Sequence, residues 1–240
     1  MILLEHVTKK YGDYTAVSNL NLEIPKGEIF GFIGPNGAGK TTTIKMMGGI
    51  MDPTSGSIRI GGINIKDEPE KAKRKIGFIP DRPYLYEKLT GREFLKFIAN
   101  LYEMDDKFFT EKAEEKLAMF SLIDWSDELI ESYSHGMKQR LIMAAALLHD
   151  PEAIIVDEPM VGLDPVAVKM VKILFKQLAG NGMTIFMSTH TLKVAEDVCD
   201  RIGIINKGIL IASGTPSELR GKTDLLDADF EDVFIKLTAL

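Results

Sequence analysis

Residues 29–41 read Ile-Phe-Gly-Phe-Ile-Gly-Pro-Asn-Gly-Ala-Gly-Lys-Thr, an apolar run that leads into a glycine-rich loop. Residues 34–41 fit the pattern G-x-x-x-x-G-K-[ST], which predicts a strand over 29–33 and a helix from Thr41 to Met51, stopped by Asp52-Pro53. In such a loop the glycines let consecutive backbone N–H groups point at phosphate oxygens, and the following helix directs its positive N-terminus at the same anion. The stretch therefore predicts a nucleotide phosphate site.

Two side chains of this site carry specific chemistry. Lys40 adds a full positive charge toward the β- and γ-phosphates, and the Thr41 hydroxyl can ligate Mg²⁺. The other residues of the loop are expected to bind mainly through their backbone. The full set of candidate nucleotide ligands in this stretch is Gly34, Pro35, Asn36, Gly37, Ala38, Gly39, Lys40, Thr41 and Thr42.

Acidic residues at the end of another buried strand complete the predicted site. Residues 153–158 read Ala-Ile-Ile-Val-Asp-Glu, so Asp157 is a candidate Mg²⁺ ligand and Glu158 a candidate general base for water. A third apolar strand is predicted over 183–188, and His190 follows it. Because such sheets bind ligands at the carboxyl ends of their strands, His190 is expected near a γ-phosphate or the attacking water. His6 and His149 lack that placement and are expected to be surface or capping residues.

Composition narrows the class of protein. The chain has 240 residues, 45% hydrophobic and 27% charged, which is ordinary globular usage. A net charge of −6 argues against a nucleic-acid partner, and five of the acids lie in the last 17 residues. No apolar stretch approaches the roughly 20 residues of a spanning helix, and the N-terminus lacks a signal-peptide pattern. We expect a soluble, cytoplasmic protein.

Strand and helix patterns alternate along the chain. Short strands at 1–7 and 20–24 and a hairpin about Gly61-Gly62 predict antiparallel structure near the N-terminus. Residues 88–150 are helical in pattern, with Ser134 as a candidate N-cap. Afterwards the α/β pattern returns, with predicted strands at 153–157, 183–188, 202–206 and 209–213 and predicted helices at 165–179 and 191–199.

Five motifs in one order carry a family resemblance. They are the phosphate loop, Ser134-x-Gly136 at a helix start, Val156-Asp157-Glu158-Pro159, Gly162-Leu163-Asp164-Pro165 and Ser188-Thr189-His190. The chain resembles the ATP-binding cassette (ABC) ATPase, the motor subunit of ABC transporters, over nearly its full length. The resemblance implies an α/β P-loop NTPase cassette with a mixed core sheet, an N-terminal antiparallel β-subdomain and an inserted helical subdomain.

The same resemblance implies one domain over residues 1–240. Its core covers about 1–87 and 151–222, its helical subdomain about 88–150, and an acidic C-terminal helix about 224–240. That last helix is expected to pack against its own domain rather than to regulate.

Residue roles follow from the resemblance. Tyr11 would stack on adenine, and Ser134 and Gly136 would bind the γ-phosphate of ATP held by a second subunit. Leu163-Asp164 would communicate between the subunits, and His190 matches the family's switch histidine. The implied ligands are ATP and Mg²⁺.

Two motifs depart from the family pattern. The usual Leu-Ser-Gly-Gly-Gln signature has become Tyr-Ser-His-Gly-Met at 133–137, with Ser134 and Gly136 retained. Asp81 stands where a Mg²⁺-ligating glutamine is usual, and its carboxylate can approach the metal directly or through water.

The resemblance predicts an ATP-hydrolysing subunit that forms a dimer, expected to be a homodimer, around two ATP molecules. It would drive a separate integral-membrane permease, docked near residues 81–103, and lie at the inner face of the cell membrane. The chain resembles the cassettes of bacterial ABC-2-type exporters in two stretches. They are Met-Lys-Gln-Arg at 137–140, which continues the signature motif, and Glu231-Asp232-Val233-Phe234. Import, a non-transport ABC ATPase acting on the ribosome or DNA, and an unrelated P-loop kinase or GTPase are the alternatives.

Overall fold

The computed structural model describes residues 1–81, 84–223 and 229–239. One of its two sheets is antiparallel and four-stranded, in the order β2-β1-β4-β5. Its strands are β1 (Ile2–Tyr11), β2 (Tyr14–Ile24), β4 (Ser55–Ile60) and β5 (Ile63–Asn64). Ile60 pairs with Ile63, which confirms the predicted hairpin about Gly61-Gly62.

The first two strands are longer than the predicted 1–7 and 20–24. Register shifts interrupt their pairing on both sides of Val7, and His6 and Asn19 have positive φ of 52° and 48°. These irregularities break the alternation of apolar and polar residues, so the sequence pattern ends before the strand does. The consequence for the site is that the hairpin continues to Tyr11 and Tyr14, which pair at its tip.

The second sheet has six strands in the order β10-β9-β3-β8-β7-β6. Pairing is parallel from β9 to β6, and β10 is antiparallel to β9. Every residue of β3, β7 and β8 is buried, as expected for parallel strands covered on both faces. The carboxyl ends of these three strands therefore meet at one edge. The strands are β3 (Ile29–Ile33), β6 (Ile76–Ile79), β7 (Ala153–Asp157), β8 (Thr184–Ser188), β9 (Arg201–Asn206) and β10 (Ile209–Gly214).

The helix behind the phosphate loop, α1 (Lys40–Met47), is shorter than predicted. Gly48 is its C-cap and Gly49 has a φ of +63°, so the helix ends in a glycine stop rather than at Asp52-Pro53. The other core helices are α2 (Pro69–Lys73), α6 (Pro165–Gly180), α7 (Leu192–Val198) and α8 (Pro216–Gly221), of which α6 and α7 agree with the predictions.

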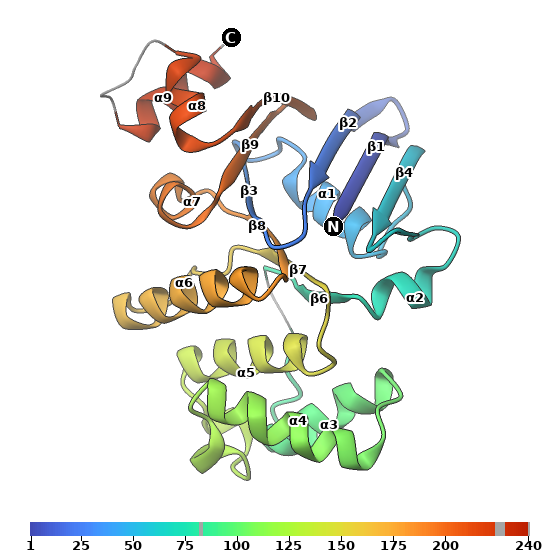
Figure 1. Cartoon of the computed structure of the whole chain (residues 1–240), viewed down its shortest axis with the longest axis vertical. Helices are drawn as coiled ribbons and strands as arrows, with labels where there is room; N and C mark the ends of the chain where they lie inside the picture. The colour runs from blue at the N-terminus through green and yellow to red at the C-terminus, as the bar shows by residue number, and fades with distance from the viewer. Residues whose placement is uncertain (82–83, 224–228, 240) are drawn as a thin grey trace.

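A group of helices, here called the helical insert, lies between β6 and β7 in the chain and to one side of the sheets (Figure 1). It comprises α3 (Gly91–Leu101), α4 (Asp106–Met119), two short 3₁₀ turns (Ile123–Trp125 and Ile130–Ser132) and α5 (His135–Leu147). Ser134 is the N-cap of α5, because its Oγ accepts a hydrogen bond from the Met137 N–H at 3.2 Å. That part of the prediction is confirmed.

The expectation for His149 is wrong. Its ring is half-buried and stacks on Tyr102 with a centroid separation of 3.7 Å, and its Nε2 lies 3.1 Å from the Ile76 carbonyl oxygen. Because Tyr102 follows α3, His149 follows α5 and Ile76 begins β6, this stack joins the helical insert to the core.

Near the C-terminus the chain forms α9 (Phe230–Thr238). Residues 224–228 and 240 of the helix predicted at 224–240 lie outside the described residues. Phe230 and Val233 are buried, and Phe234 and Leu237 pack partly buried against the same core. The expected packing of this helix against its own domain is confirmed.

Candidate functional site

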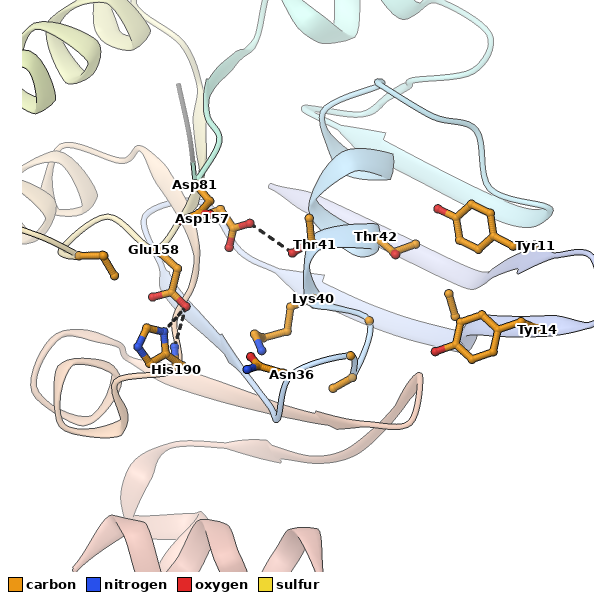
Figure 2. Close-up of a pocket in the computed structure, with 15 residues that line it drawn as sticks. Tyr11, Tyr14, Asn36, Lys40, Thr41, Thr42, Asp81, Asp157, Glu158 and His190 are labelled. Atoms are coloured by element: carbon orange, nitrogen blue, oxygen red, sulfur yellow. Dashed lines mark hydrogen bonds and ion pairs between the residues drawn. The ribbon is translucent and has the colours of Figure 1, made fainter. Parts of the chain in front are cut away.

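A cavity of about 460 Å³ opens at the carboxyl edge of β3, β7 and β8, with residues of the β1–β2 tip at its far end (Figure 2). It gathers most of the residues predicted from sequence. Its lining is Tyr11, Tyr14, Ala16, Asn36, Gly37, Ala38, Gly39, Lys40, Thr41, Thr42, Asp81, Asp157, Glu158, Val161 and His190.

The phosphate loop connects β3 to α1 and turns on backbone that only glycine adopts readily. Gly39 has a φ of +111°, and a Cβ there would lie 2.6 Å from the Ala16 carbonyl oxygen. Lys40 reaches back along the loop, and its Nζ donates to the carbonyl oxygens of Gly34 at 2.6 Å and Pro35 at 3.2 Å. Burial lowers the pKa of Lys40, and the carboxylates of Glu158 and Asp157 oppose that shift. The loop thus presents a half-buried ammonium group to the cavity.

Asp157 ends β7 directly opposite Ser188 of β8. Its Oδ1 accepts from the Ser188 hydroxyl at 2.7 Å, and its Oδ2 lies 3.5 Å from the Thr41 hydroxyl, a long hydrogen bond. Burial raises the pKa of Asp157, with Glu158 and Asp81 acting in the same direction and the Ser188 hydrogen bond and Lys40 opposing it. A buried carboxylate in this setting favours a bound cation.

Glu158 follows in a strained conformation, with a φ of +52°. Its N–H donates to the Ser188 carbonyl oxygen at 2.9 Å. Its Oε1 accepts from the N–H of His190 at 2.9 Å and lies 2.7 Å from His190 Nδ1, while its Oε2 accepts from the Thr189 hydroxyl at 3.1 Å. The end of the neighbouring strand β8 and the two residues after it therefore fix both the backbone and the carboxylate of Glu158.

Two tyrosines lie at the far end of the cavity from Lys40 (Figure 2). Tyr11 is the predicted one, and its hydroxyl donates to the sulfur of Met51 at 3.2 Å. Tyr14 was missed by sequence reasoning. Both side chains are accessible to a ligand, with exposed fractions of 48% for Tyr11 and 61% for Tyr14. The turn residues Gly12-Asp13 between them were the available signal, because a two-residue hairpin turn places its flanking residues side by side.

Asp81 follows β6 and lines the cavity from the side of Asp157, as Figure 2 shows. Four of the described residues predicted as ligands do not line the cavity: Gly34 and Pro35 at the start of the phosphate loop, and Ser134 and Gly136 at the N-terminus of α5. Asp164 caps α6 through an N–H of Ala167 at 2.9 Å, and Leu163 packs partly buried against the core. Sequence analysis named Ser188 and Thr189 only as part of a motif and did not predict that they orient Asp157 and Glu158. It also missed the cavity residues Ala16 and Val161.

Comparison of the sequence with known protein families leads to the same kind of site. Residues 17–161 match the family model described as ABC transporter. The chain belongs to the ABC transporter family. Within this family, cassettes bind ATP, and the resemblance seen in the sequence is confirmed.

The relatives of this ABC cassette include proteins of resistance and transport systems. It is 42% identical over 238 residues to the linearmycin resistance ATP-binding protein LnrL of Bacillus subtilis, covering 99% of this chain and 75% of LnrL. It is 41% identical over 220 residues to the bacitracin transport ATP-binding protein BcrA of Enterococcus faecalis, covering 91% and 70%. Identity to the probable multidrug ABC transporter ATP-binding protein YbhF of Escherichia coli is 36%, covering 99% of this chain but 41% of YbhF.

Solved structures support the same fold. An ATP-binding subunit of an ABC transporter superposes with a TM-score of 0.92 at 32% identity, covering 99% of both chains. A dimeric post-hydrolysis state of the cassette MJ0796, bound to ADP and Pi, superposes with a TM-score of 0.80 at 30% identity, covering 90% of this chain and 98% of that one. Within the described part of this chain, no helix is long and apolar enough to cross a membrane.

Proposed function

We propose that this chain binds and hydrolyses ATP as one of two identical subunits and drives a separate membrane permease. The arrangement of Glu158 carries the proposal. A carboxylate has about four acceptor positions, and three hydrogen bonds from Thr189 and His190 take three of them. The remaining position is on Oε2, so the attacking water would give its proton to that oxygen. Lys40 and the loop N–H groups would hold the phosphates during in-line attack.

The residues around Asp157 fit Mg²⁺. That ion is held in such sites by one or two protein oxygens together with phosphate oxygens and water, and Thr41 and Asp157 offer a hydroxyl and a carboxylate side by side. Over the described ranges, no group of three or more His, Cys, Asp or Glu side chains could hold a metal ion. Thr41 and Asp157 would hold the metal, with Asp81 beside them. Bound there, Mg²⁺ would neutralise charge on the β- and γ-phosphates.

The base of ATP would lie against the tip of the β1–β2 hairpin. Tyr11 and Tyr14 are the aromatic residues at that end of the cavity, and an adenine ring stacks favourably on such side chains. The phosphates would then extend toward Lys40, along the length of the cavity.

The N-terminus of α5 supports a two-subunit arrangement. Ser134 and Gly136 present a small hydroxyl and an open backbone at a helix N-terminus, a setting that binds anions, yet they lie outside the chain's own cavity. A second copy facing the first would place each pair on the γ-phosphate bound by the other chain. MJ0796, which this chain resembles, is a dimer in its ADP and Pi state.

A groove of about 580 Å³ between the segment after β6 and α5 is the proposed permease contact. Its lining includes Tyr84, Leu85 and Ile142, and the Glu87–Lys138 ion pair at 2.5 Å connects its two sides. Tyr84, Tyr86 and Phe97 surround an adjoining apolar hollow of about 270 Å³. Residues 82 and 83 of the predicted docking segment lie outside the described residues. A short amphipathic helix of the permease would fill this surface and hold the chain at the inner face of the membrane.

Export is the proposed direction of transport. The names of LnrL, BcrA and YbhF refer to linearmycin resistance, bacitracin transport and probable multidrug transport, and export of a toxic compound by this chain's transporter would serve resistance of that kind. These relatives favour transport over an ABC ATPase that acts on the ribosome or DNA, and family membership disfavours an unrelated kinase or GTPase.

Phosphate release from ATP by the purified chain tests the enzymatic part. We expect turnover that requires Mg²⁺ and is lost in Lys40→Ala, with Lys66→Ala, an exposed lysine outside the cavity, as the matched control. Turnover that persists in Lys40→Ala would contradict the assignment. Co-purification with a hydrophobic protein from detergent-solubilised membranes tests the permease, and recovery with ribosomes or DNA would contradict it.

A further inference from the structure

The imidazole of His135 lies against the backbone of Gly162. A Cβ built on Gly162 would be 2.7 Å from His135 Nε2, closer than side chains pack, and 3.4 Å from its Cδ2, in ordinary contact. The ring therefore occupies the space that a side chain at position 162 would need. Gly162 also has a φ of +75°, so two separate features favour glycine there.

This contact joins two parts of the molecule that the chain separates. His135 is the first residue of α5 in the helical insert, beside Ser134 and Gly136. Gly162 belongs to the loop of residues 159–164, which runs from Glu158, the residue after β7, to Asp164, the N-cap of α6. The contact therefore connects the helix start proposed to bind the partner's γ-phosphate with the loop that follows the proposed catalytic base.

His135 also faces the groove proposed for the permease. It lines that groove with Lys138 and Gln139, and Asp81, which lines both the groove and the nucleotide cavity, lies on the opposite side. His135 stands where the family signature usually has glycine, so its ring adds a contact that a glycine cannot make.

We propose that His135 is a positioning residue that sets the distance between the α5 N-terminus and the 159–164 loop, so that both meet the second subunit together. The inference rests on the proposed two-subunit function. A rotation of the helical insert against the core must move the His135 ring across Gly162. A permease segment bound in the groove would contact the same ring. His135 thereby links the groove to the subunit contact without touching the chain's own nucleotide.

A double-mutant cycle in the full chain tests this role. Glu158→Gln serves as the background, and the ATP concentration that gives half-maximal dimer is measured by analytical ultracentrifugation. Gly162→Ala adds backbone strain in every background, but it adds a clash only where the His135 ring is present. We expect Gly162→Ala to raise that concentration about tenfold with His135 present and about threefold or less together with His135→Ala, a coupling typical of residues in contact.

Binding of a fluorescent ATP analogue by the monomer separates positioning from a merely structural effect. Monomer affinity should stay within about twofold in all four proteins, because the chain's own phosphate loop is unchanged. His135→Ala alone should also raise the ATP concentration needed for dimerisation, because the spacing ring is lost. His135→Gln, whose amide can reach the same place, should reverse that increase. Equal effects of Gly162→Ala with and without the ring would overturn the inference and leave the two-subunit function intact. Absence of any ATP-dependent dimer in the Glu158→Gln background would instead overturn both.

Discussion

The Nδ1 atom of His190 lies 2.7 Å from Oε1 of Glu158, and the backbone N–H of the same histidine donates to the same oxygen. With Glu158 ionised, Nδ1 must carry its hydrogen and act as the donor. Side-chain exposure differs sharply across this pair, at 61% for His190 and 12% for Glu158. The exposed imidazole thus holds a largely buried carboxylate in place, at the edge where a γ-phosphate would lie.

His190→Ala should therefore lower the rate of hydrolysis more than it lowers ATP affinity. The variant loses the Nδ1 contact but keeps the backbone hydrogen bond to Glu158, so we expect a decrease of at least about tenfold in kcat, within the range for a general base and its orientation. Steady-state phosphate release measures it. His6→Ala, an exposed histidine of β1 outside the cavity, is the control. Equal kcat in His190→Ala and the parent protein would contradict the positioning of Glu158 by His190.

Asp157→Asn should make the nucleotide-free protein more stable while it abolishes turnover. Because burial raises the pKa of Asp157, its ionised form is disfavoured in the folded state at neutral pH, and this penalty disappears as the pH falls through that raised pKa. The amide oxygen of asparagine can still accept from Ser188, so the neutral side chain avoids the penalty. We expect an increase of about 2 °C in Tm at pH 7 by calorimetry. A Tm below that of the parent protein would contradict this balance.

Tyr14 and Tyr11 should both contribute to base binding. Removal of either ring by alanine should weaken ATP binding about threefold to tenfold, the usual range for an aromatic contact, and leave kcat nearly unchanged. Titration with ATP and with inorganic triphosphate separates the base from the phosphates, since triphosphate affinity should not change. Phe108→Ala, a partly exposed aromatic residue on α4, is the matched control. Unchanged ATP affinity in Tyr14→Ala would remove that residue from the site.

His149 should make the fold sensitive to mild acid. Burial lowers its pKa from 6.5 to about 4, against the opposing effects of the Ile76 hydrogen bond and Asp150. The unfolded chain binds this proton more tightly, so stability that is present above pH 6.5 is lost as the pH falls toward 4. The loss between pH 7 and pH 5 should be about 2 kcal/mol. His149→Phe keeps a ring to stack on Tyr102 but cannot be protonated. Its free energy of unfolding in urea should therefore fall between pH 7 and pH 5 by about 2 kcal/mol less than that of the parent protein. An equal loss in both proteins would contradict it.

Much of the site could be predicted from sequence because each of its motifs is a short run of residues next to a recognisable strand. The phosphate loop, Asp157-Glu158 and His190 each follow an apolar strand, and parallel strands bring their carboxyl ends to one edge. The fold of the core followed from the same alternation of strands and helices. The packing of α9 was also predictable, because its apolar residues recur at helical spacing.

Other features have a weak local signal or none. Tyr14 reaches the cavity because β1 and β2 continue past their bulges, and the bulges hide that continuation, so that only the Gly12-Asp13 turn indicated it. His149 is half-buried because Tyr102 and Ile76 meet it from distant parts of the chain. The contact between His135 and Gly162 likewise appears only once the helical insert lies against the core.

The most direct test of the central claim is the behaviour of Glu158→Gln in ATP and Mg²⁺. Glutamine keeps the shape of the side chain but cannot accept a proton from water. We predict that this variant binds ATP, accumulates as a dimer in size-exclusion chromatography and hydrolyses ATP at least about 100-fold more slowly than the parent protein. Turnover within twofold of the parent protein, or a chain that stays monomeric with ATP bound, would contradict the account.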